Sequence, residues 1–461
     1  MTCFSRRQFF SSGVAGIGLL SSTARELLAQ AAESLPARTK AREAMRIADV
    51  EMHEILAPFH DYHAETLFRY HGLGAQLRTI YAVRTEGGLE GCGESWGRAP
   101  KTHPYKRYVG TDPFDWMADP HDLPMNMAIY DLLGKFLGVP VWKLLGPKVR
   151  SWVPVSAWTA SQTPQGMAEE VRSVATRGYR WMKYHVDVLQ NVADQTAAMQ
   201  KVAPRGFKVH YDFNGDSTFE AVYPVLRELE KFPVAGRIED PIRAVDHEGY
   251  RILRQKCSLP IVVHHAPADF FMLHSLCDGF MAGHAPLGQA MSLAALAQAT
   301  NTPFMLQQCG GTINQAFLTH EAAVFSKATI DHVSLCHLWK DDVTVENMPV
   351  VGGSVQVLDK PGLGVTLDRE KLRRYVQAPR PKQTRFLVRV RYAQGPTIYF
   401  RFDPDAPDAN LRFLPGNVPG PTPGYGNPVI TDFWDEAGSE AFEEVWKRTA
   451  TKPFWKEDTS T

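Results

Sequence analysis

Short apolar runs alternate with longer stretches of helical spacing between residues 153 and 306. The first five runs begin 25 to 29 residues apart, which suits one strand and one returning helix. We predict repeated β/α units that close into a parallel barrel; a doubly wound open sheet is the alternative, but no G-x-G-x-x-G loop follows the first run. The predicted strands are 153–156, 181–185, 207–212, 236–239, 261–264, 279–282 and 303–306, and two predicted helices are 164–176 and 220–231.

A different pattern precedes these units. Residues 47–52 and 77–83 alternate apolar and polar side chains, as strands of an antiparallel sheet do, and a polar loop at 58–65 separates them. Residues 125–137 have helical spacing that ends at Gly138. We predict a small α+β domain over residues 45–150, followed by the barrel and its return segment over residues 151–376.

The chain continues beyond the barrel as an extension over residues 377–461. Residues 386–392 and 397–402 flank a Gln-Gly turn and predict a hairpin, with a helix later at 436–448. One face of the first strand would be apolar and the other would carry Arg385, Arg389 and Arg391. We expect this extension to pack on the barrel or on another subunit; an anion-binding or lid function is the alternative.

The first residues have the layout of an export signal. Arg6-Arg7 precedes a short apolar stretch at 13–20 and a small-residue cleavage site at 29–31. Paired arginines resemble the twin-arginine type, which is read by an export machinery for folded proteins. The apolar stretch is too short to span a bilayer, which takes about 20 residues. We predict a signal peptide over residues 1–31 and a periplasmic or otherwise extracytoplasmic location.

Charge balance limits the possible partners. The 461 residues include 50 Lys and Arg against 50 Asp and Glu, so the formal net charge is zero. A nucleic-acid-binding protein would show a basic excess or a basic stripe. Nucleic acid is therefore not an expected partner.

Polar residues gather at the ends of four successive predicted barrel strands. In a parallel barrel, the carboxyl ends of all strands meet on one face, and that face carries the active site. Residues distant in sequence would converge there. The pairs are Lys183 and His185, Asp212 and Asn214, Glu239 and Asp240, and His264 and His265.

Three segments carry a family resemblance. Residues 83–95 (VRTEGGLEGCGES), 128–146 (AIYDLLGKFLGVPVWKLLG) and 361–368 (PGLGVTLD) resemble the enolase superfamily, in its mandelate racemase and muconate lactonizing branch. The resemblance runs from about residue 47 to residue 375. It implies a modified (β/α)7β TIM-type barrel with an N-terminal α+β capping domain.

The resemblance also implies a reaction. A carboxylate substrate would bind a divalent metal while a base removes the proton alpha to the carboxylate, giving an enolate. Asp212 and Glu239 match the first two ligand positions, and His265 stands where the third carboxylate is usual. His264 could substitute for it, or the site could be weak. The family implies Mg²⁺; a histidine ligand shifts the preference toward Mn²⁺, Fe²⁺ or Zn²⁺.

The family's Lys-x-Lys motif corresponds to Lys183 and His185, which share one face of a strand. We assign acid/base work to this pair, with His185 able to act as the base near neutral pH. The family's opposite-face dyad would fall at Gly283 and Gln307, so it is missing, and His284 lies one position away. This favours a lyase, a sugar-acid or hydroxy-acid dehydratase. A racemase or epimerase needs a second base such as His284, and a non-catalytic binding barrel is the third alternative.

Substrate contacts are expected from the capping loop and from the strand ends. The expected ligand is a small carboxylate molecule, and the relatives suggest a symmetric homo-oligomer. The candidate substrate-binding residues are His60, Tyr62, His63, Asn214 and Gln307.

Overall fold

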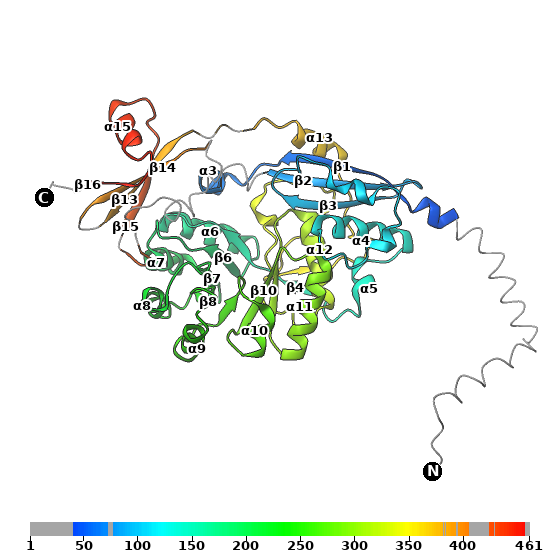
Figure 1. Cartoon of the computed structure of the whole chain (residues 1–461), viewed down its shortest axis with the longest axis horizontal. Coiled ribbons are helices and arrows are strands. Elements are labelled where there is room, and N and C mark those ends of the chain that lie inside the picture. The colour runs from blue at the N-terminus through cyan, green and yellow to red at the C-terminus, as the bar shows by residue number, and fades with distance from the viewer. Residues whose placement is uncertain are drawn as a thin grey trace, which may run out of the picture.

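A computed structural model describes residues 40–71, 77–380, 382, 384–392, 395–404, 424–427 and 429–456. A barrel lies below a capping sheet, and a further sheet stands to one side of them (Figure 1). The predicted signal peptide at 1–31 lies outside the described residues. Within them, no helix combines the length and apolar character needed to cross a membrane.

Seven parallel strands form the barrel sheet, in the order β11-β10-β9-β8-β7-β6-β5. Each neighbour in space is the neighbour in sequence, as the regular spacing predicts. The strands are β5 Ala157–Thr159, β6 Trp181–His185, β7 Lys208–Asp212, β8 Ala235–Glu239, β9 Ile261–Val263, β10 Gly279–Gly283 and β11 Phe304–Gln307. The helices are α6 Pro164–Thr176, α7 Val192–Val202, α8 Phe219–Leu229, α9 His247–Lys256, α10 Ala268–Leu273, α11 Leu287–Thr300 and α12 Thr312–Val324.

The start of the barrel differs from the prediction. The apolar run at 153–156 is not the first barrel strand, because β4 (Trp152–Pro154) pairs antiparallel with β12 (Ser354–Gln356). Pro154 has no N–H to donate and suits this short edge pairing. The barrel strand β5 starts at Ala157. Isolated parallel bridges from Gln307 to Val333 and from His332 to Val155 continue the ring between β11 and the segment before β5.

The capping sheet is antiparallel, in the order β1 (Ile47–Leu56), β2 (Leu77–Thr85), β3 (Glu90–Trp96). Helix α4 (Leu123–Leu137) covers it so closely that a Cβ at Gly93 would lie 2.0 Å from the Pro124 carbonyl oxygen. The predicted polar loop at 58–65 is partly helical, since α3 spans Asp61–His71. Leu67 in α3 is fully buried and packs the helix against the rest of the protein. The polar residues around Leu67 made this segment look like a loop in the sequence. Two further helices are α5 Val141–Leu145 and α13 Arg369–Val376.

The extension contains the predicted hairpin within a four-stranded sheet of order β15-β13-β14-β16. Its apolar face is buried, whereas the arginines of the other face already have carboxylate partners: Arg389 and Arg391 contact Asp432, and Arg385 contacts Glu443. These contacts leave little support for anion binding by the arginines. The elements are β13 Phe386–Tyr392, β14 Thr397–Phe402, β15 Val429–Trp434, β16 Phe454–Lys456 and α15 Glu440–Arg448.

Candidate active site

The pairing register of β6, β7 and β8 places the central residues of the site next to one another. Parallel pairing places His185 beside Asp212, and Asp212 beside Glu239, at the carboxyl ends of β6, β7 and β8. Lys183 lies two residues before His185 and is fully buried. The structure thus brings these four residues together, as the sequence analysis expects.

Lys183 joins the two carboxylates. Its Nζ lies 3.1 Å from Asp212 Oδ2 and 2.7 Å from Glu239 Oε2, and it donates a 2.7 Å hydrogen bond to Gln307 Oε1. Burial lowers the pKa of Lys183, but the charges of Asp212 and Glu239 outweigh burial and raise it above its usual value. Gln307, an expected substrate residue, thus belongs to the Lys183 environment.

One ammonium does not balance two buried carboxylates. Burial and the charge of Asp212 raise the pKa of Glu239 well above its usual value, although Lys183 acts in the opposite direction. The local excess of negative charge favours a further cation. The residues therefore have the electrostatic character of a cation site.

His185 reaches from this cluster toward the opening. Its Nε2 lies 3.1 Å from Asp212 Oδ2, and its side chain is 17% exposed, whereas Lys183 has no exposure. The imidazole also makes an edge contact with the Trp158 ring at 5.3 Å. Of the two strand residues, His185 is the one that a substrate can approach from solvent.

His210 is a member of the cluster that the sequence analysis missed. Its Nδ1 accepts a hydrogen bond from Arg237, and its Nε2 lies 2.8 Å from Glu239 Oε2. Burial, with Arg237 nearby, lowers the pKa of His210 well below its usual value, so the ring is neutral. Alternation along β7 puts His210 on the face of Asp212, and this periodicity was the available signal.

Two overlapping groups could hold a metal ion. Asp212, Glu239 and Asp240 are buried, and each offers an oxygen within 4.8 Å of the others; Asp240, His264 and His265 form the second group. Three carboxylates form a hard oxygen donor set of the kind that Mg²⁺ prefers. The buried residues therefore fit a divalent cation.

Asp240 has a positioning role as well. Its two carboxylate oxygens accept the backbone N–H groups of His264 at 2.8 Å and His265 at 3.1 Å. Burial raises the pKa of Asp240 to about 6 despite these bonds. Asp240 thereby fixes the turn that presents both histidines at the end of β9.

The two histidines differ in placement. The His265 side chain is exposed, whereas His264 is partly buried, with Nδ1 3.8 Å from Glu239 Oε1. Burial lowers the pKa of His264 to about 3, which leaves a neutral ring. The geometry brings His264 closer than His265 to the Glu239 carboxylate.

His264 also accounts for the missing acid at position 283. A Cβ built on Gly283 would lie 2.0 Å from His264 Nε2. The imidazole therefore occupies the space that any side chain at position 283 would need. The two departures from the family pattern are sterically matched.

His284 follows Gly283 and lines a pocket. Its Nε2 is 3.7 Å from Cys309 Sγ, and both residues line a cavity of about 630 Å³ between the cap and the barrel. Burial, followed by the positive charge of Lys183, lowers the pKa of His284. The structure thus brings His284 near the Lys183 centre but on the side of β10 and β11.

Three residues that follow the carboxyl ends of barrel strands have strained backbone conformations. Asn214, Asp240 and His284 have φ values of 59°, 42° and 52°, and each follows the end of a barrel strand. Such left-handed conformations in non-glycine residues are costly and concentrate at functional sites. Asn214 also donates its backbone N–H to Asp212 Oδ1 at 2.9 Å, so it positions that carboxylate.

The capping-loop residues make structural contacts. His63 Nδ1 lies 3.0 Å from Glu170 Oε1, and Tyr62 donates to Glu170 Oε2 at 3.1 Å. Burial lowers the pKa of His60 to about 4.

None of the three predicted substrate residues His60, Tyr62 and His63 lines the cavity between the cap and barrel. The cavity is instead lined on the cap side by residues such as Tyr81, Trp96 and Arg98, which the sequence analysis did not select.

Comparisons with known proteins agree with this geometry. Residues 166–371 match the family model described as enolase C-terminal domain-like. The D-galactonate dehydratase of Xanthomonas axonopodis pv. citri (strain 306) is 27% identical over 280 residues, covering 55% of this chain and 73% of that protein. The dehydratase of the same name from Variovorax paradoxus (strain S110) is 26% identical over 274 residues, covering 54% and 71%.

Solved structures share the fold. A mandelate racemase/muconate lactonizing family protein from Azoarcus sp. EbN1 has a TM-score of 0.59 and 21% identity, covering 72% of this chain and 98% of that one. A dipeptide epimerase from Cytophaga hutchinsonii has a TM-score of 0.58 and 18% identity, covering 71% and 98%. The predicted barrel with an N-terminal cap is confirmed.

Proposed function

We propose that the protein is a metal-dependent lyase of the enolase superfamily that dehydrates a sugar acid or related hydroxy acid. The match of residues 166–371 to the enolase C-terminal domain-like model supports the superfamily. The carrying observation is the row of His185, Asp212 and Glu239 on three adjacent strand ends, with Lys183 beneath it. This row combines a base, an ammonium and a cation site within one small volume. The dehydratase names of the relatives support the choice of reaction.

Asp212 and Glu239 would hold the divalent ion, with Asp240 or His264 completing the protein ligands. A bound ion would supply positive charge that stabilises the enolate of the substrate. An all-carboxylate set favours Mg²⁺, whereas participation of His264 or His265 shifts the preference toward Mn²⁺, Fe²⁺ or Zn²⁺.

Two side chains of the protein would supply the positive charge and the proton transfer that the reaction needs. Lys183, as a buried ammonium, would hold the Asp212 and Glu239 carboxylates in place and add positive charge beneath the reacting atoms. Because Nε2 faces Asp212 Oδ2, His185 would accept the alpha proton on its other ring nitrogen. The resulting imidazolium would return that proton to the β-hydroxyl group, which leaves as water. The enol product then becomes a 2-keto acid by tautomerisation. One group can serve both steps when proton and hydroxyl leave from the same face.

His284 supports an epimerase as the second candidate. It lies near Lys183 on the side of β10 and β11, where a second acid/base group would have to be. In its protonated form, its ring could deliver a proton to the enolate from the opposite face. Epimerisation would retain the hydroxyl group, so the product distinguishes the two candidates.

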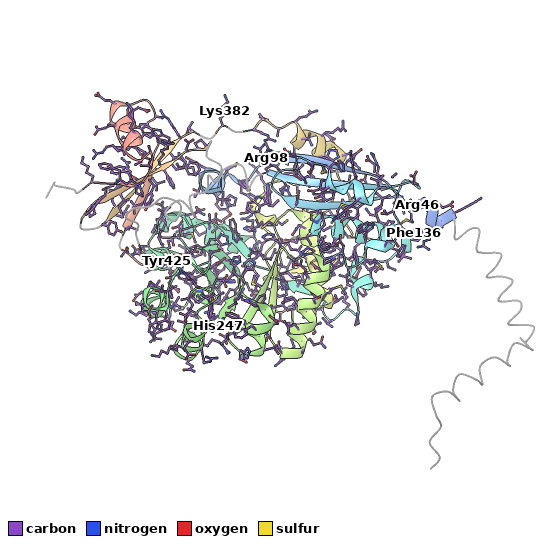
Figure 2. All side chains as sticks on the ribbon, in the orientation of Figure 1. Arg46, Arg98, Phe136, His247, Lys382 and Tyr425 are labelled. Atoms are coloured by element: carbon purple, nitrogen blue, oxygen red, sulfur yellow. The ribbon has the colours of Figure 1, made fainter. Side chains whose placement is uncertain are left out.

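Product analysis tests the proposal. The metal-loaded protein is incubated with a panel of sugar acids, and 2-keto acids and epimers are separated by chromatography. We expect a 2-keto acid from wild type and at least a 100-fold lower rate for His185→Asn. His247→Asn is the matched control, because His247 lies on the outer helix α9, away from Arg98 and the capping side (Figure 2). Epimers without a keto acid would exclude the lyase, and no product with any acid would contradict both enzymes.

The location is a separate proposal. Arg6-Arg7 and the short apolar stretch behind them support twin-arginine export, which would let the enzyme load its metal before leaving the cytoplasm. Cell fractionation of wild type and the Arg6→Lys/Arg7→Lys variant tests it. Retention of only the variant in the cytoplasm is expected, and equal distribution would contradict export by this route.

A further inference from the structure

Beneath the last residues of β6, β7 and β8 lies a second row of polar side chains. The strand register aligns Lys183, His210 and Arg237, each of which lies two residues before the end of its strand. Residues two apart along a strand share a face, so this row points into the barrel like the row above it. Lys183 and His210 have no exposed surface, and Arg237 is 7% exposed. Branched apolar residues usually fill this space, and buried polar groups are costly unless each has a partner.

Arg237 is held by contacts on several sides. Its Nη1 donates to Asp331 Oδ2 at 3.0 Å, and its Nε donates to His210 Nδ1 at 3.0 Å. The guanidinium carbon lies 3.8 Å from the centre of the Trp181 ring. Trp181 in turn packs closely on the main chain, because a Cβ at Gly236 would lie 2.3 Å from its ring. Arg237 is therefore a firmly placed donor to His210.

The contact with Arg237 determines where the His210 ring carries its hydrogen. A guanidinium has N–H donors and no acceptor, so His210 Nδ1 must accept and cannot itself carry a hydrogen. The hydrogen of the ring therefore lies on Nε2. Nε2 lies 2.8 Å from Glu239 Oε2 and has no other hydrogen-bond partner among the described residues. His210 is thus a donor to the Glu239 carboxylate.

Glu239 is the point at which the two rows meet. Besides His210, Lys183 reaches its Oε2, with Nζ at 2.7 Å. Two buried side chains therefore restrict the orientation of this carboxylate. Partners that hold a metal-binding side chain in this way matter for the metal, because their loss weakens metal binding by about 10- to 100-fold.

We propose that His210 and Arg237 are positioning residues of the cation site. Arg237 fixes the tautomer of His210, and His210 holds the Glu239 carboxylate as a metal ligand. The inference rests on the proposed function, because Glu239 must bind the ion. Both residues act through Glu239, and neither is a catalytic residue.

Calorimetric titration with Mn²⁺ alone tests the role of His210 without turnover. His210→Asn keeps an acceptor for Arg237 but is too short to donate to Glu239, whereas His210→Gln places its amide nitrogen near the position of Nε2. We expect His210→Asn to bind Mn²⁺ at least tenfold more weakly than wild type, and His210→Gln to stay within about threefold of wild type. His320→Asn is the matched control, since His320 is also fully buried but hydrogen bonds to the Leu363 carbonyl oxygen. Its affinity for Mn²⁺ should stay within about twofold of wild type.

A double-variant comparison tests the role of Arg237. Arg237→Met should weaken Mn²⁺ binding by about 3- to 10-fold, because His210 loses the donor that fixes its ring. Combined with His210→Asn, the same change should add less than about twofold, since Arg237 acts through His210. Losses that multiply in the double variant would contradict that route.

NMR of the protein labelled with ¹⁵N-histidine measures the tautomer directly and needs no metal. The His210 ring is identified by the signals that His210→Asn or His210→Gln lacks. We expect the hydrogen on Nε2 in wild type. This measurement decides the tautomer even where the Asn variant does not fold.

Several results would overturn the proposal: a hydrogen on Nδ1, wild-type affinity in His210→Asn, equal losses in the Asn and Gln variants, or an equal loss in His320→Asn. No Mn²⁺ binding by wild type would reject both this proposal and the proposed function. A selective loss of affinity in His210→Asn, in a protein that forms no 2-keto acid, would keep the positioning role and reject the lyase.

Discussion

At the scale of single residues, His264 and Gly283 form a matched pair. The imidazole lies where a side chain at position 283 would stand, and the same ring reaches within 3.8 Å of Glu239. Two sequence changes that look independent are therefore one steric arrangement. Its consequence is measurable by substitution.

Gly283→Ala is expected to destabilise the protein by about 1–3 kcal/mol, because the new methyl group clashes with His264. His264→Ala in the same chain should recover most of that loss, since it removes the clashing ring. Denaturant unfolding of the two single variants and the double variant measures the coupling. Additive losses would show that His264 does not occupy the position 283 space.

A second residue-scale prediction concerns Glu321, which α12 buries completely. Gln308 donates to its Oε2 at 2.6 Å, and burial raises the pKa of Glu321 to about 8. The folded protein thus binds a proton that the unfolded chain releases above pH 4.5. This contribution to stability is lost as pH rises from about 4.5 to about 8.

Glu321→Gln should therefore raise the free energy of unfolding at pH 8 by roughly 2–4 kcal/mol and have little effect at pH 5. Thermal or urea unfolding across this pH range measures the difference. The same change at exposed Glu169 provides the control. An equal effect of Glu321→Gln at both pH values would contradict a raised pKa.

At the scale of elements, Glu170 joins the capping helix α3 to the barrel helix α6. Besides Tyr62 and His63, Thr159 and Gln162 donate to its Oε1 at 3.0 and 2.9 Å. The carboxylate is fully buried, so every lost donor or lost charge leaves an uncompensated partner. The contacts hold α3 against the barrel wall.

Glu170→Ala should free α3 and make the segment 58–71 sensitive to limited proteolysis, with a loss of about 2–4 kcal/mol in stability. Glu169→Ala, next to it on the exposed face of α6, should change neither. Mass spectrometry of the first cleavage products locates the cut. Protection equal to wild type would contradict the anchoring role.

Elements were the easiest part to predict from sequence. Helix 164–176 and strands 181–185, 386–392 and 397–402 coincide with α6, β6, β13 and β14, because strong periodicity is local information. Asp212, Glu239 and Lys183 followed from strand-end position. Glu170 and Cys309 could not be predicted, because their importance arises from contacts across more than 100 residues or from a cavity that only the folded chain creates.

At the level of the whole molecule, the extension contacts both the loops at the carboxyl ends of the barrel strands and helix α3 of the cap. Thr431 donates to the Leu189 carbonyl after β6, and the Tyr425 ring lies 5.3 Å from the Phe213 ring after β7. Arg69 of α3 donates to Asp435 at 3.0 Å. The extension therefore contacts the loops that follow the strands of His185 and Asp212, which the barrel pattern alone did not indicate.

Proton exchange at the alpha carbon of a bound acid is a direct test of enolate formation at this site. The metal-loaded protein and a sugar acid are placed in D₂O, and NMR follows loss of the alpha-proton signal alongside any 2-keto product. We expect exchange or product with wild type, and at least 100-fold slower exchange with His185→Asn, while His247→Asn matches wild type. Undiminished exchange in His185→Asn would contradict its role as the base, and no exchange with any acid that binds would contradict enolate chemistry at this site.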